Sequence, residues 1–273
     1  MVQPYSSAKG KIMYKKDEVL VLNSENNMLP FASAKYFQDV SINYYNPREM
    51  KPGNVIYYFA MISSHLKGQK IAPHPEDRTT DGRVPDYSKV KLIVLESISR
   101  IWDMMFEYLD IANTSKDKRV VYGDFQKECT GFLRKCSAMP IPKIYISHDD
   151  QTQDDKMQIN RCAYVPGKKL AGKIESYVNV ALFCLPDPYK TKAKERFRFL
   201  TSWYDNCIAK TPLGMYGDDQ LFIENDVSLV IKRLHEMYGA EFGKFRFPDI
   251  FITGASGSGK STSLRNLITE KSK

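Results

Sequence analysis

The feature that most constrains this chain is a glycine-rich segment near its C-terminal end, FPDIFITGASGSGKSTSLRNL, residues 247–267. Within it, the eight residues from Gly254 to Ser261 match the pattern GxxxxGK[ST] in full. An apolar run precedes the glycines and a helix-compatible segment follows them, which is the context that this motif requires. The segment therefore predicts a phosphate-binding loop between a strand and a helix. The alternative is a flexible Gly/Ser linker close to a terminus.

The residue types of this loop suit a nucleotide with its metal ion. Glycines let the backbone curl so that successive N–H groups point at phosphate oxygens, and the following helix presents its N-terminal dipole to the same charge. Lys260 is expected to reach the β and γ phosphates, and Ser261 to offer its hydroxyl to Mg²⁺. The expected cofactors are therefore ATP and Mg²⁺. The residues predicted to hold them in the loop are Gly254, Ala255, Ser256, Gly257, Ser258, Gly259, Lys260, Ser261 and Thr262.

Elsewhere the chain alternates short apolar runs with amphipathic segments, which predicts an α/β fold. Nearly continuous apolar runs predict strands buried on both faces at 17–25, 89–97, 142–150, 177–185 and 248–254. Helical spacing predicts helices over 97–112, 123–136 and 226–239, the last with Asp226 as N-cap and Gly239 as C-cap. The polar stretches 67–90 and 149–162 are predicted to be loops. Residues 195–205 and 206–212 are predicted to pair as a hairpin.

Hydrolysis of a nucleotide also needs an acidic group near the metal and a group that orients or deprotonates water. Three apolar runs end in suitable residues: Glu25, Glu96 and His148. The carboxyl ends of strands converge on the ligand side of an open α/β sheet, so we expect these side chains to meet the loop. We assign Glu96 with Ser261 to the metal shell, Glu25 to water activation and His148 to sensing the γ-phosphate. Taken singly, each would more often be a surface cap.

Taken in this order, the segments resemble the RecA-like ATPases, and more closely the phage-encoded AAA-type proteins that include Sak-type single-strand annealing ATPases. GASGSGKSTSLRNL resembles their Walker A segment, VLVLNSENNMLPF the strand with the catalytic glutamate, LIVLESIS the Walker B segment and IYISHDD the sensor strand. The resemblance implies a P-loop NTPase with a mainly parallel RecA-like sheet and helices on both faces. It also implies an ATPase that acts in DNA recombination, repair or replication.

The same resemblance implies ATP sites between the subunits of a homo-oligomer. A neighbouring subunit would then donate a positive charge, for which Lys168, Lys169 and Lys173 are the candidates. An exposed loop and helix face is the alternative explanation of these lysines.

The order of the segments departs from the family, because the Walker A segment comes last and only twelve residues follow Ser261. If Lys273 ran into Met1, the family order would be restored. We therefore expect residues 1–273 to form a single, circularly permuted RecA-like domain. The alternative is that the final loop begins a second domain.

Charge and composition bear on partners and location. The formal charge of +8 favours polyanions, and basic residues alternate with aromatic ones in the stretch Lys190, Lys192, Lys194, Arg196 and Arg198. This mixture predicts contact with single-stranded DNA, and a solvated basic edge strand is the alternative. The absence of an apolar run of roughly 20 residues predicts no membrane span. The five cysteines lack CxxC spacing, which predicts reduced thiols and a cytoplasmic location, the host cytoplasm if the chain is viral.

Two other classes of function stay open. A P-loop kinase acting on a nucleoside or other small molecule shares the phosphate grip, although the stretch 67–90 supplies only Arg78 and Arg83 for an arginine-rich lid. A nucleotide-regulated nucleic-acid-binding module is the other. No motif for base recognition distinguishes ATP from GTP.

Overall fold

The computed structural model describes residues 6–8, 11–25, 37–114, 117–153, 157–187, 197–217, 219–238 and 248–267. Its strands are β1 (Ser6–Ala8), β2 (Lys11–Met13), β3 (Val19–Asn23), β4 (Gln38–Ser41), β5 (Leu92–Glu96), β6 (Lys143–Gln153), β7 (Ile159–Ala163), β8 (Val180–Pro186), β9 (Phe197–Leu200), β10 (Phe222–Glu224) and β11 (Asp249–Gly254). Its helices are α1 (Val55–Leu66), α2 (Ile98–Ala112), α3 (Lys118–Ala138) and α4 (Val227–Tyr238), with 3₁₀ segments η1 (Lys16–Glu18), η2 (Tyr87–Lys89), η3 (Ile174–Tyr177) and η5 (Ser261–Leu267).

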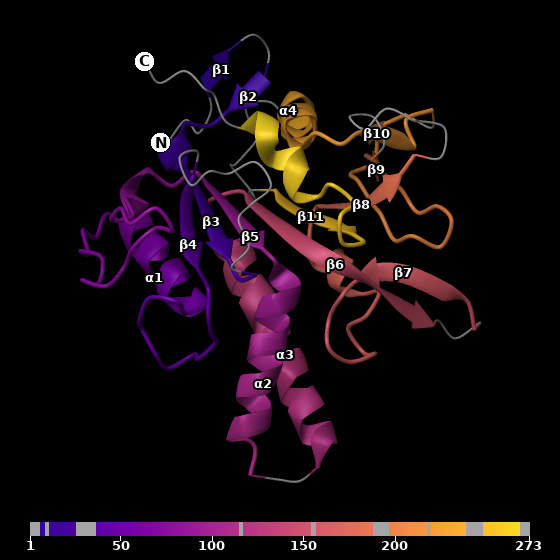
Figure 1. Cartoon of the computed structure of the whole chain (residues 1–273). Helices are drawn as coiled ribbons and strands as arrows, with labels where there is room; N and C mark the ends of the chain where they lie inside the picture. Colours follow the sequence, from indigo (N-terminus) through magenta and orange to yellow (C-terminus); the bar gives the residue numbers. More distant parts are fainter. Residues whose placement is uncertain are drawn as a thin grey trace.

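A mixed, mostly parallel sheet organises the molecule (Figure 1). Nine strands take part among the described residues, in the order β10-β9-β8-β11-β6-β5-β3-β4, with β7 paired to β6. The strands from β8 to β4 are parallel, while β9, β10 and β7 pair antiparallel with their neighbours. The last strand of the chain, β11, therefore lies inside the sheet, between β6 and β8.

Helices cover both faces of this sheet. Helices α1, α2 and α3 pack on one face, where Phe251 of β11 points, and α4 with η5 packs on the other, where Ile250 and Ile252 point. Successive residues of a strand face opposite sides, so a strand between two helical layers must be apolar throughout. This explains why β3 and β5, buried at every position, are apolar up to their last residues, Asn23 and Glu96. The α/β class and the five predicted strands are confirmed.

The predicted helices are also present, and α3 and α4 begin at capping aspartates, Asp117 and Asp226. Asp226 accepts a hydrogen bond from the backbone N–H of Ser228 at 2.9 Å, which confirms it as the N-cap of α4. Gly239, the predicted C-cap, lies outside the described residues. Trp102 of α2 is fully buried and packs edge-on against Phe132 of α3.

Two predictions about local structure were wrong. The stretch 149–162 is not a loop: β6 continues to Gln153 and pairs with β7. From His148 on, β6 is half-buried or exposed, so its side chains are polar and lack the pattern of a buried strand. Residues 206–212 do not form a strand with 195–205. Instead β9 pairs with β8 and β10, while Cys207 makes only isolated bridges.

Candidate functional site

The glycine-rich loop connects β11 to η5 and requires glycine at both of its ends. Gly254 has a φ of 155°, and a Cβ there would lie 2.6 Å from the carbonyl oxygen of Cys184 on β8. Gly259 has a φ of 82°, and a Cβ there would lie 2.9 Å from Nδ2 of Asn225. Side chains at these positions would push the loop away from its neighbours. The motif therefore fixes a tight turn against β8 and the start of α4.

Lys260 closes this turn from the inside. Its Nζ donates to the carbonyl oxygens of Gly254 at 2.7 Å and of Ala255 at 2.8 Å. The residue is 7% exposed, and burial lowers the pKa of its ammonium group. The ammonium group of Lys260 is thus held against the loop backbone, where its positive charge would attract a bound phosphate group.

The second element of the site joins the loop to β5. The hydroxyl of Ser261 donates to Oε1 of Glu96 at 2.8 Å, across 165 positions of the sequence. Glu96 is 7% exposed, and its Oε2 is buried without a hydrogen-bond partner in the described part of the chain. Burial raises the pKa of this carboxyl group to about 7. A buried carboxylate oxygen without a partner is stabilised by binding a cation or a proton.

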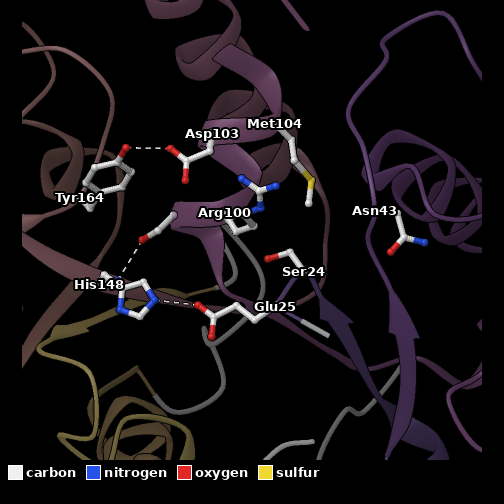
Figure 2. A pocket seen from close by; sticks show the side chains of 9 residues that line it. Ser24, Glu25, Asn43, Arg100, Asp103, Met104, His148 and Tyr164 are labelled. Carbon is white, nitrogen blue, oxygen red and sulfur yellow. Dashed lines mark hydrogen bonds and ion pairs between the residues drawn. The ribbon is translucent and has the colours of Figure 1, made fainter. Parts of the chain in front are cut away.

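The third element is a pair between β3 and β6. Oε1 of Glu25 and Nε2 of His148 lie 2.7 Å apart (Figure 2). The hydrogen bond from His148 lowers the pKa of the Glu25 carboxyl group, against the opposing effect of its partial burial. Glu25 is therefore held in the ionised form, which is the form that accepts a proton from water or another hydroxyl.

All three elements border one cavity of about 260 Å³. The strands β3, β5, β6 and β11 deliver Glu25, Glu96, His148 and the loop in that spatial order along the carboxyl edge of the sheet. The lining residues are Glu25, Glu96, Ser97, Ile146, His148, Ser256, Gly257, Gly259, Lys260, Ser261 and Thr262. The residues singled out from sequence as catalytic or metal-binding, including Lys260 and Ser261, thus lie together.

Hydroxyl groups that the sequence did not single out lock this arrangement. Ser24 Oγ accepts from the N–H of Ser97 at 2.9 Å, which ties the end of β3 to the end of β5. Ser99 Oγ accepts from the N–H of His148 at 2.9 Å and lies 3.0 Å from Ser147 Oγ. Serine is common in loops and caps, so nothing in its local sequence reveals this role.

Other candidate residues lie elsewhere. Lys168, Lys169 and Lys173 are exposed and do not line this cavity of about 260 Å³ in their own chain. The predicted basic strand is described only at Arg198, because 188–196 lie outside the described residues. The guanidinium of Arg198 donates to the carbonyl oxygen of Phe222 at 2.7 Å and lies 3.4 Å from Asp187. That group is engaged in holding β9 to β10.

The residues present fit a nucleotide with Mg²⁺. The unpartnered Oε2 of Glu96 and the hydroxyl of Ser261 are oxygen ligands of the kind Mg²⁺ takes. Within the described residues, no three His, Cys, Asp or Glu side chains gather to hold a metal by themselves. A Mg²⁺ here would take its remaining oxygens from phosphates and water, as is usual for this ion. Its chemistry would be to neutralise the charge of the β and γ phosphates.

Comparison of the chain with protein-family models, with curated proteins and with solved structures finds no match. Among the described residues, no helix combines the length and the apolar character that crossing a membrane demands. The function is therefore argued from the geometry of the carboxyl edge of the sheet.

Proposed function

We propose that this chain binds ATP with Mg²⁺ and hydrolyses it. The observation that carries the proposal is the convergence of four strands on one cavity, where the Ser261–Glu96 contact of 2.8 Å lies beside the Glu25–His148 contact of 2.7 Å. Phosphate-transfer sites work by positioning and by charge, with a cationic cradle, a metal shell and a water-orienting group. This cavity supplies a residue for each of these three needs.

Each side chain has a distinct role in the proposed reaction. Lys260 and the loop N–H groups bind the phosphates, and Ser261 with Glu96 holds the metal shell. Glu25 accepts the proton of the attacking water, and His148 holds Glu25 by the hydrogen bond between them. When bound, Mg²⁺ would neutralise charge that develops on the phosphate oxygens.

A permuted RecA-like order belongs to the same proposal. It is supported by the place of β11, which lies between β6 and β8 although it comes last in the chain. Along the chain, with Lys273 joined to Met1, the segments that start from β11 are the phosphate loop, Glu25, Glu96 and His148, which is the order of the family that the sequence resembles. We extend the proposal to an ATPase that acts on DNA, with single-stranded DNA as the expected partner.

The decisive experiment replaces Lys260 by Ala and measures phosphate release from ATP with Mg²⁺. We expect turnover to fall below detection in a variant that still folds, with an unfolding midpoint lowered by the loss of the two hydrogen bonds from Lys260 to Gly254 and Ala255. Undiminished turnover in the folded variant would refute the assignment. Repeating the native assay with and without single-stranded DNA tests the proposed partner, since an ATPase that acts on DNA should change its rate.

A further inference from the structure

A second cavity adjoins the first at the Glu25–His148 pair. Its volume is about 640 Å³, and it lies where α2 starts, near the end of β3 and His148 of β6 (Figure 2). Glu25 and His148 line both this cavity and the cavity of about 260 Å³ at the glycine-rich loop, the proposed phosphate cavity, so the two cavities meet at this pair. The remaining lining residues are Ser24, Asn43, Ser99, Arg100, Asp103, Met104 and Tyr164.

The chemistry of this second cavity suits a small polar molecule. Asp103 accepts a hydrogen bond from the Tyr164 hydroxyl at 2.7 Å, which holds its carboxylate in place where it lines the cavity (Figure 2). Arg100 comes from the same helix face, and its ion pair with Glu107 is long, at 3.5 Å, and exposed. Met104 adds an apolar surface. Cavities of ~300–1,000 Å³ with a few convergent polar groups are typical small-molecule sites.

We propose that the second cavity binds a hydroxyl-bearing small molecule of nucleoside or sugar size, and that the chain transfers the γ-phosphoryl group of ATP to that hydroxyl. The proposal rests on the proposed binding of ATP in the phosphate cavity. Its basis is that Glu25 and His148 border both cavities, so a hydroxyl bound beside Arg100 and Asp103 would lie next to the same base that would otherwise activate water. Asp103 accepts hydrogen bonds from the hydroxyl groups of this acceptor, and Arg100 donates to its oxygens.

The transfer balances without any further reactant. The acceptor oxygen forms a bond to the γ-phosphorus and gives its proton to the Glu25 carboxylate. The bond between the γ-phosphorus and the bridging oxygen breaks, and its electron pair leaves with ADP, whose charge Lys260 offsets. The products are ADP and a phosphorylated acceptor. Water takes the place of the acceptor when the second cavity is free, which gives the hydrolysis proposed above.

The test follows the label of ATP radiolabelled at the γ-phosphate. The full chain is incubated with Mg²⁺ and labelled ATP, together with either a mixture of ribo- and deoxyribonucleosides or a mixture of hexoses and pentoses. Chromatography separates inorganic phosphate from phosphorylated acceptor. We expect label on a member of one mixture, and the two arms show whether a nucleoside or a sugar is the source of the hydroxyl.

Two variants test the residues of the cavity, and a third is their control. Arg100→Ala and Asp103→Asn should each lower the ratio of labelled acceptor to inorganic phosphate by at least tenfold. Asp103→Asn keeps the size of the side chain and its hydrogen bond from Tyr164, so the fold is protected. Arg134→Ala removes an exposed arginine of α3 outside both cavities and should leave the ratio unchanged.

The outcomes separate this inference from the function on which it rests. Release of inorganic phosphate alone, with both mixtures present, would overturn phosphoryl transfer and leave the ATPase in place. A labelled acceptor whose yield is indifferent to both cavity variants would also overturn the inference, because the acceptor would then bind elsewhere. Loss of all label release would refute the proposed function and this inference together.

Discussion

The two edges of the parallel sheet hold buried acids in opposite ways: Asp249 lies at the start of β11 beside Lys143 of β6, and Glu96 lies at the end of β5. At the amino end, Asp249 and Lys143 form an ion pair at 3.1 Å, and their side chains are 1% and 0% exposed. The amine also donates to the carbonyl oxygens of Met139 and Ile141, and Asp249 accepts from Ser137. At the carboxyl end, Glu96 has a single hydroxyl partner and no ion pair in the described part of the chain.

The difference shows what each end is for. A buried charge needs a partner charge and hydrogen bonds, and the amino end supplies both from the protein. At the carboxyl end, Oε2 of Glu96 has no hydrogen-bond partner in the described part of the chain. A bound metal ion would be that partner. Stability and function should therefore separate between the amino and carboxyl edges of the sheet, and substitutions at the two edges should reveal it.

The largest effect is expected at the amino end. Asp249→Ala leaves the Lys143 ammonium buried without its counter-charge, and breaking such a pair costs about 3–5 kcal/mol. Urea unfolding at neutral pH measures the loss. The double variant Lys143→Met with Asp249→Leu removes both charges and should be less destabilised than the single variant. Equal losses in the two would mean that packing, and not the charge, is what matters there.

At the carboxyl end, Glu96→Gln should stabilise the chain at high pH when Mg²⁺ and nucleotide are absent. The pKa of Glu96 is raised from 4.5 to about 7 in the folded state. Below pH 4.5 the Glu96 carboxyl group is protonated in both the folded and the unfolded chain, so it does not affect the free energy of unfolding. Above pH 7 it is ionised in both, and the buried charge lowers the free energy of unfolding by about 3 kcal/mol. The native chain should thus lose stability from pH 4.5 to 7, and the variant should not.

Unfolding with EDTA present at pH 4.5, 6 and 8 measures this difference. The free energy of unfolding of the variant minus that of the native chain should grow with pH and reach its largest value at pH 8. A difference that stays constant with pH would show that Glu96 is not an isolated buried acid. Added Mg²⁺ and ATP should stabilise the native chain more than the variant, because a bound metal would replace the proton.

How far the sequence could predict this molecule depends on the kind of contact. Continuous apolar runs predicted the buried strands because a strand between two helical layers is apolar on both faces. They missed β10, since Phe222–Glu224 is only three residues long, and α1, whose apolar surface is too continuous to show a helical period. The ion pair between Lys143 and Asp249 could not be predicted from the sequence, because a lysine at the start of a strand is normally exposed to solvent.

The residues of the site were predictable for a different reason. Parallel strands bring the carboxyl ends of their apolar runs to one edge, so the polar residues at the end of each run mark the site even without contact information. The structure differs at β6, which continues past His148 to Gln153. This rule placed Glu25, Glu96 and His148 correctly near the loop. It could not place Ser24 or Ser99, because their hydrogen bonds run to backbone groups of other strands.

Glu25→Gln should reduce ATP turnover about a hundredfold, the order expected when a positioned base is lost. That is equivalent to about 2.7 kcal/mol of activation free energy. ATP affinity and the urea midpoint should change little, because the amide can keep the contact with His148. Steady-state phosphate release and equilibrium nucleotide binding measure the two quantities. If Glu96→Gln shows slow turnover with intact binding and Glu25→Gln is active, the two carboxylates have been exchanged.

The smallest effect is expected from Ser137→Ala at the amino end. The Ser137 hydroxyl donates to Oδ2 of Asp249 at 2.8 Å, whereas the attraction of Lys143 acts on Oδ1 of the same group. Losing one hydrogen bond to a buried charge costs about 1–3 kcal/mol. The loss of stability should lie at the low end of this range, because the ion pair itself is kept. The variant should retain ATP turnover, since Ser137 is at the far end of the sheet from the phosphate loop.

Urea unfolding and phosphate release, measured on one preparation, check the two expectations. A drop in turnover larger than the folded fraction explains would show that the two ends are coupled through β11, and the separation of stability from function along this strand would fail.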